Sequence, residues 1–110
     1  MDYQHKDLAA GGWKKLSFVE QMANIGSEVE RALNWKNKNN AHYSSMAFER
    51  ALELLDLTIE NEKRRNHLRE LLRLREALAD YFASKNVYGS TPKNWHSYFH
   101  AFSFAARIKH

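Results

Sequence analysis

The chain has 110 residues, of which 44% are hydrophobic and 13% aromatic, with four glycines and one proline. This length and composition are typical of one small domain with a packed core, and they exclude a disordered or low-complexity chain. The absence of cysteine excludes disulfide scaffolds, thiolate metal sites and cysteine nucleophiles. A formal net charge of +4 favours anionic partners without requiring them.

The first fifteen residues mix both charges with small side chains. They lack the continuous apolar core of a signal peptide, and no later apolar run approaches membrane-spanning length. We therefore expect a flexible N-terminal segment over residues 1–15 and a single helical domain over residues 16–110. We also expect a cytoplasmic protein with no membrane association.

The first helix is expected over residues 17–36, where Ser17 and Glu20 have the spacing of a capping box. Its apolar positions recur at helical spacing and are Phe18, Met22, Ile25, Val29, Ala32 and Leu33. An asparagine-rich turn follows.

The second helix is expected over residues 41–60. Its apolar side comprises Met46, Ala47, Ala51, Leu54, Leu55 and Ile59, and its other side is an acidic stripe of Glu49, Glu53, Asp56 and Glu60.

The third helix is expected over residues 63–85, with a buried side made of Leu68, Leu71, Leu72, Leu78, Ala79 and Phe82. Thr91 and Pro92 have the form of an N-cap followed by proline at the first helical position, which starts a fourth helix over residues 92–107. The core side of this helix comprises Trp95, Tyr98, Phe99, Phe102, Ala105 and Ala106.

Four amphipathic helices with short connections, and no segment with strand alternation, predict an all-α fold. The expected architecture is a four-helix bundle with up-down-up-down topology. Several aromatic residues are left outside the predicted core, where they would pack under the ends of the bundle or form an oligomer or partner surface. They are Trp13, Trp35, Tyr43, Tyr81 and Phe104.

The segment RRNHLRELLRLRE, residues 64–76, carries the densest positive charge in the chain. Arg65, Arg69 and Arg73 follow one another at intervals of four, so they form one stripe on the third helix, which continues into Glu76 and Asp80. Two interpretations remain open. The stripe is either a solvated helix face with local Arg–Glu pairs or a phosphate-binding ridge that Arg64 extends. Arginine contacts to phosphate would not by themselves confer sequence specificity.

Arg75 is a separate case, because it lies between leucines on the apolar side of the third helix. A buried guanidinium is costly unless a carboxylate meets it. We therefore expect a structural ion pair, either between helices or between subunits. The candidate partners on the second helix are Glu49, Glu53 and Asp56.

No glycine-rich phosphate loop, nucleophile motif or catalytic acid pair is present, so the sequence predicts no catalytic residues and no cofactor. His96 and His100 are four residues apart on the fourth helix, but the glutamate of a metalloprotease helix is missing between them. We expect an exposed polar stripe with Ser103 and Arg107, and no metal site. His67, beside Arg64, is an alternative candidate for a general base in RNA cleavage.

The segments Ser27-Glu-Val-Glu-Arg-Ala-Leu33 and Phe48-Glu-Arg-Ala-Leu-Glu-Leu54, with the chain length and helical pattern, resemble the HEPN group of small prokaryotic helical bundles. Members of that group act as RNases or as partners of minimal nucleotidyltransferases in toxin–antitoxin pairs. Their RNases carry an arginine that is followed by a histidine after four to six residues. Arg64 and His67 are too close for that signature, and Arg31 and His42 are too far apart. The resemblance therefore implies a non-catalytic partner role.

In size, basic second half and lack of a catalytic motif, the chain also resembles the four-helix-bundle accessory subunits of diversity-generating retroelements. This resemblance covers the whole chain at the level of architecture. It implies a ring-like oligomer that binds a reverse transcriptase and RNA through basic surfaces.

Together these observations predict a non-enzymatic accessory or adaptor subunit. We expect it to form a homo-oligomer, to bind a partner protein, and to bind RNA through Arg64, Arg65, Arg69 and Arg73. The alternative is a HEPN-like RNase or toxin–antitoxin component that uses His67. A third possibility is a purely protein-binding module, in which the aromatic residues matter and the arginines do not.

Overall fold

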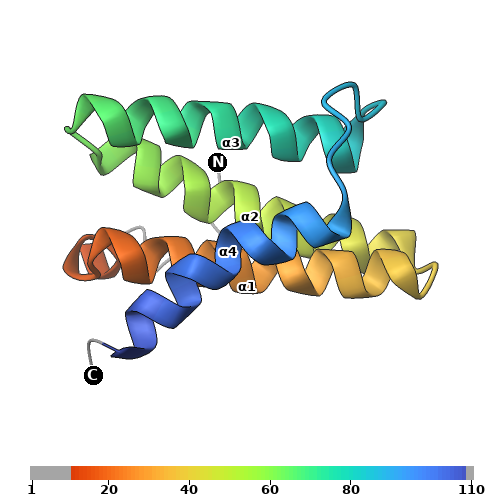
Figure 1. Cartoon of the computed structure of the whole chain (residues 1–110), viewed down its shortest axis with the longest axis horizontal. Coiled ribbons are helices and arrows are strands. Elements are labelled where there is room, and N and C mark those ends of the chain that lie inside the picture. The colour runs from red at the N-terminus through yellow and green to blue at the C-terminus, as the bar shows by residue number, and fades with distance from the viewer. Residues whose placement is uncertain (1–10, 109–110) are drawn as a thin grey trace.

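The structure is a computed structural model that describes residues 11–108 (Figure 1). Within this range a short 3-10 helix, η2 (Trp13–Lys15), precedes four α-helices and no strand occurs. The helices are α1 (Phe18–Asn37), α2 (Ala41–Asn61), α3 (Arg65–Ala83) and α4 (Pro92–Ile108). Successive helices run in opposite directions, which confirms the predicted all-α bundle with up-down-up-down topology.

Local capping residues determine where three of the helices begin. Ser17 Oγ accepts a hydrogen bond from the Glu20 amide at 3.2 Å, and Glu20 Oε1 accepts one from the Ser17 amide at 3.0 Å, so the predicted capping box is present. Asn40 caps α2 through the Tyr43 amide. Thr91 and Asn94 exchange two such bonds at the start of α4. Each predicted helix boundary lies within two residues of the observed one, and the starts of α2 and α4, which carry such caps, coincide with the prediction.

The helices pack unevenly around the bundle. α1 packs along α2 and also against α4, and α2 packs along α3, whereas the backbones of α3 and α4 stay apart. In Figure 1, α3 runs along the top of the view and α4 crosses α1 obliquely. The crossing is tight at Gly26, where a Cβ atom would lie 2.8 Å from Phe99 Cβ. One side of the bundle, between α3 and α4, is therefore less closely packed than the others.

The buried core agrees with most of the predicted positions, with four corrections. Met46 and Leu72, which were expected in the core, are 38% and 47% exposed. The buried residues of α3 follow a narrow arc through Leu71, Leu74, Leu78 and Tyr81, because α3 packs mainly against α2. Leu72 lies outside this arc. Met46 is next to the buried Ala47 and lies at the edge of the buried face of α2.

Trp13 and Tyr81, which were expected outside the core, are buried. Trp13 Nε1 donates a hydrogen bond to Thr58 Oγ1 at 2.8 Å, and the Trp13 carbonyl accepts one from Gln21 Nε2 at 2.9 Å. The indole N–H and the backbone carbonyl of Trp13 are therefore both hydrogen-bonded although the residue is buried. Residues 1–10 of the predicted N-terminal segment lie outside the described residues.

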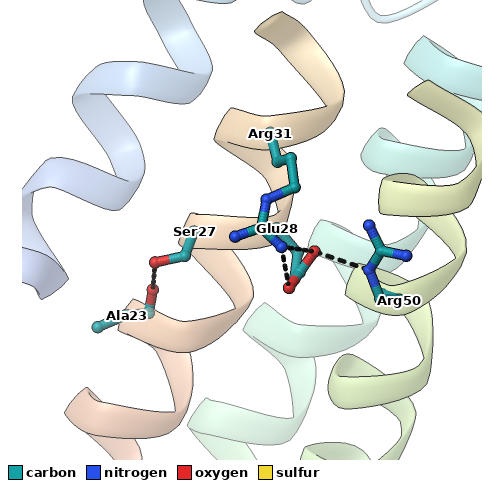
Figure 2. A network of polar contacts seen from close by, with 5 residues as sticks. All are labelled: Ala23, Ser27, Glu28, Arg31 and Arg50. Atoms are coloured by element: carbon teal, nitrogen blue, oxygen red, sulfur yellow. Dashed lines mark hydrogen bonds and ion pairs between the residues drawn. The ribbon is translucent and has the colours of Figure 1, made fainter. Parts of the chain in front are cut away.

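Arginine–carboxylate ion pairs join α1 to α2 and α2 to α3. Glu28 on α1 accepts hydrogen bonds from Arg31 and, across the helix interface, from Arg50 Nε at 3.2 Å (Figure 2). The Glu28 side chain is only 12% exposed, so both cations act where solvent screening is reduced. Arg75 Nε lies 2.7 Å from Asp56 Oδ1 of α2, so Arg75 pairs between helices, the first of the two alternatives, with one of the three candidate carboxylates. Both side chains of that pair are nearly half exposed, so Arg75 lies at the edge of the core.

None of the helices in the described range combines the length and the apolar character that crossing a membrane requires.

Candidate nucleic-acid interface

A groove of about 690 Å³ lies between α3 and α4, on the loosely packed side of the bundle. The α3 wall carries the arginine stripe, and the groove is lined there by Arg65, Asn66, Arg69, Glu70 and Arg73. The opposite wall belongs to α4 and the residues before it, namely Ser90, Asn94, Trp95 and Tyr98. Leu74 and Ala77 add apolar surface from α3. The groove therefore combines a basic wall with apolar and aromatic surface.

Arg65, Arg69 and Arg73 are all exposed, and together they form one wall of this groove. Successive members of the stripe are roughly 6 Å apart along the helix axis, given the rise of an α-helix. None of the three side chains makes a hydrogen bond or ion pair with any residue in the described range. Three guanidinium groups are thus available to a ligand.

The acids that follow the arginines on α3 are occupied elsewhere. Asp80 accepts hydrogen bonds from the backbone amides of Val87 and Tyr88, at 2.8 and 3.0 Å, and so holds the loop that leads to α4. Glu76 accepts a hydrogen bond from the Tyr88 hydroxyl at 3.3 Å. The local Arg–Glu pairs of the solvated-face interpretation are therefore not formed with these two acids.

Inside the groove, the Tyr98 hydroxyl donates a hydrogen bond to Glu70 Oε2. Burial raises the pKa of Tyr98 well above its usual range, and the hydrogen bond to Glu70 and the charge of Glu70 raise it further. The phenol therefore remains a donor at neutral pH, and it fixes one oxygen of the Glu70 carboxylate. Trp95 is only 5% exposed, and its indole N–H has no acceptor within the described range.

Arg64 is separate from the other predicted contacts, because it does not line the groove. Its Nε lies 2.9 Å from Glu62 Oε1, and its guanidinium lies over the Phe18 ring, 5.5 Å from the ring centre. The side-chain hydrogen bond from Arg64 lowers the pKa of Glu62 to about 2, and the Arg64 amide and charge assist although burial opposes the shift. The four-arginine ridge thus divides into three groove residues and one paired residue.

His67 belongs to the same small cluster as Arg64. Its ring stacks on Phe18, with 4.1 Å between ring centres, and its Nδ1 lies 3.6 Å from Glu62 Oε2. The imidazole thus lies between an aromatic ring and a carboxylate, but its Nδ1 is buried without a hydrogen-bond partner in the described range. It does not line the groove. The structure brings His67 and Arg64 together around Glu62 and separates both from Arg65, Arg69 and Arg73.

His96 and His100 line a second hollow, of about 430 Å³, between α1 and α4. Both side chains are exposed, as predicted, and Ser103 lines the same hollow, whereas Arg107 does not. His96 Nδ1 shares a hydrogen bond with Glu30 of α1, a partner that the sequence did not indicate. Across residues 11–108, no three histidine, aspartate or glutamate side chains converge in a way that could hold a metal ion.

Sequence reasoning located the basic wall of the groove and missed the opposite wall. Trp95 and Tyr98 were predicted only as core residues, and Asn94 and Ser90 were not singled out. The aromatic content of α4 could have indicated this wall, because it is higher than one narrow buried face of a helix requires. Comparison of the chain with protein-family models, with curated proteins and with solved structures finds no match, so its function has to be argued from this geometry.

Proposed function

We propose that this protein is a non-enzymatic accessory subunit that binds RNA along the α3 wall of the groove. The observation that carries the proposal is the set of three arginines, Arg65, Arg69 and Arg73, that face one groove without a partner in the described range. An unpaired guanidinium retains its full capacity for a phosphate, which it matches with a planar fork of donors.

The distribution of charge on α3 supports this assignment. A helix face with arginines at every fourth position usually carries acids that pair with them. Here Glu76 and Asp80 instead bind the loop before α4, and Glu70 binds Tyr98. These hydrogen bonds leave the charge of the acids in place but direct the carboxylates toward other partners than the arginines. Three guanidinium groups therefore line the groove against the single carboxylate of Glu70, an excess of positive charge that would attract a polyanion.

An accessory role accords with the fold and with the exposed apolar surface. Leu72, Val87, Phe104 and Ile108 are each at least 47% exposed, and they supply apolar surface that a second chain could cover. We propose that such contacts produce a homo-oligomer and a partner interface in the cytoplasm, in the manner that the resemblance to retroelement accessory subunits implies. The resemblance is architectural, so the arginine groove is the feature to be tested first.

The test is fluorescence anisotropy of a labelled single-stranded RNA, titrated with purified protein at several salt concentrations. We expect Arg69→Glu with Arg73→Glu to weaken binding by at least about tenfold and to reduce the slope of log K against log salt by about 1.4, because two phosphate contacts are lost. Lys14→Glu with Lys15→Glu is the matched control. Both lysines are exposed and outside the groove, and the net charge changes equally.

Circular dichroism on every variant would establish that the bundle remains folded, and light scattering would give the oligomeric state. If the two double variants weaken binding equally, only net charge matters and the groove is not the site. If neither weakens binding, the proposal is wrong.

RNA cleavage by His67 is a second candidate, favoured by one observation. Its imidazole is held against Phe18 with Nδ1 toward Glu62, an arrangement that could orient a general base. This candidate predicts cleavage products on prolonged incubation of the same RNA, and loss of those products in His67→Ala. Intact RNA with the wild-type protein would exclude it, and cleavage that persists in the variant would point to a contaminating nuclease.

A further inference from the structure

We propose that the groove accommodates an unstacked base of single-stranded RNA and that Glu70 selects bases carrying an exocyclic amino group. This inference rests on the proposed function and specifies its ligand. It is carried by the Glu70 carboxylate, which lines a groove whose same wall bears three arginines, and by the hydrogen bond from Tyr98 that holds one of its oxygens.

The carboxylate of Glu70 determines which part of a nucleotide can enter. A phosphate group placed beside Glu70 would be repelled, whereas the three arginines on the same wall attract it. The sugar–phosphate backbone should therefore follow the arginines, and the part of the nucleotide that reaches Glu70 should be uncharged and rich in donors. A nucleobase with an amino group has this character.

The size and chemistry of the groove also fit a base. Its volume of about 690 Å³ is far more than arginine–phosphate contacts alone would need. Its apolar lining consists of the partly exposed Ala77 and the edges of the largely buried Leu74 and Trp95, and the ring of the half-buried Tyr98 adds aromatic surface. Unstacked bases of single-stranded RNA pack against aromatic side chains and form hydrogen bonds along their edges. Asn66 and Asn94, on opposite walls, supply amide groups that both donate and accept. A base paired within a duplex would not reach these groups.

Glu70 supplies the discrimination. Tyr98 occupies Oε2, and Oε1 has no hydrogen-bond partner within the described range, so the carboxylate presents a fixed acceptor to the groove. Carboxylates accept hydrogen bonds from the cytosine amino group, whereas uracil presents a carbonyl oxygen at the same position. Cytosine should therefore be favoured over uracil by about tenfold, as expected for one hydrogen bond to a charged group.

The test compares oligocytidylate with oligouridylate, each of about 12 nucleotides, by anisotropy at neutral pH. The two have equal charge, so the arginine contacts cancel in the comparison. We expect the wild type to prefer oligocytidylate by about tenfold. In Glu70→Gln, whose side-chain carbonyl can still accept from Tyr98, the preference should largely disappear while the salt dependence stays unchanged. Glu49→Gln, an exposed position on α2, is the charge-matched control.

A second variant tests base insertion without changing charge. Ala77→Leu fills part of the groove and should weaken binding of both oligomers severalfold, whereas Ala101→Leu adds equal bulk at an exposed position outside the groove and should not. Equal affinity of the wild type for the two oligomers would overturn selection by Glu70. Binding of duplex RNA as tight as that of oligocytidylate, unchanged in Ala77→Leu, would overturn base insertion.

These outcomes are distinguishable from failure of the proposed function, which is shown by RNA binding that does not depend on Arg69 and Arg73. Oligoglutamate that binds as tightly as oligocytidylate would assign the groove to an acidic protein segment, and would also overturn the inference.

Discussion

Glu62, in the short connection between α2 and α3, is a carboxyl group whose protonation is linked to the fold. It accepts hydrogen bonds from both the backbone amide and the guanidinium of Arg64, each at 2.9 Å, and its side chain is 6% exposed. These contacts stabilise the ionised carboxylate and hold the direction in which α3 leaves the connection. The pKa of Glu62 falls to about 2 as a result.

This lowered pKa predicts a dependence of stability on acid. Because the folded-state pKa lies below the ordinary value of 4.5, the contribution of Glu62 is fully present above pH 4.5 and is lost as the pH falls toward 2. We expect Glu62→Gln to be less stable than the wild type at neutral pH and to lose less of its remaining stability between those two pH values. Urea denaturation followed by circular dichroism at a series of pH values measures this.

Glu60→Gln is the control for that experiment, because Glu60 is exposed and has no ion pair in the described range. It should reproduce the pH dependence of the wild type. A Glu62→Gln variant whose free energy of unfolding follows the wild-type pH profile would contradict the role assigned to the carboxylate.

At the residue scale, spacing along a helix was enough to predict the arginine stripe and the ion pair of Arg75. It was not enough to predict which arginines remain without partners. Asp80 binds the Val87 and Tyr88 amides, and those donors are exposed to it only by the path of the loop before α4. A helical wheel shows the positions of side chains around one helix and gives no information about the loop. It therefore grouped Asp80 with the acids that could neutralise the arginine stripe.

At the scale of elements, the crossing of α1 and α4 depends on a single small residue. Gly26 is buried, and a Cβ atom at its position would lie within 2.9 Å of three Phe99 atoms, among them Phe99 Cβ. Cβ is bonded to the backbone of α4, so rotation of the phenyl ring does not relieve the contact. The helices would have to move apart.

Gly26→Ala should therefore destabilise the protein. Overpacking costs about 1–3 kcal/mol and alanine gains about 1 kcal/mol in helix propensity, so we expect a net loss of up to about 2 kcal/mol. Chemical denaturation measures the free energy of unfolding. Ser27→Ala, at the exposed neighbouring position, should change stability far less. A more stable Gly26→Ala variant would show that α4 adjusts freely and that the crossing is not tightly fixed.

The helices were predictable because local capping residues mark where they begin. These residues are Ser17 with Glu20, Asn40, and Thr91 with Pro92. The side of each helix that faces the core was less predictable. Leu72 belongs to the apolar side of α3 in sequence, yet it is 47% exposed because no helix covers that part of the surface. Burial depends on the neighbours of a helix as well as on its own periodicity.

At the scale of the whole molecule, the groove exists because α4 packs on α1 and leaves α3 to be held by α2. Sequence periodicity gives each helix a buried face but not the partner that it meets. Trp95 and Tyr98, on the α4 wall of the groove, were therefore assigned to the core, and the polar residues of that wall were not singled out. A candidate site that spans two helices is visible only after their packing is known.

The same uneven packing has a thermodynamic consequence. Side-chain contacts such as Glu70 with Tyr98 and Tyr81 with Trp95 connect α3 to α4, but the backbones of the two helices stay apart, and each packs instead along α2 or α1. A strand of RNA bound between α3 and α4 would contact both helices and would connect them where their backbones do not pack directly. Because such a ligand binds only the folded arrangement, its binding energy would add to the stability of the fold. The protein would then be most resistant to heat when its groove is occupied.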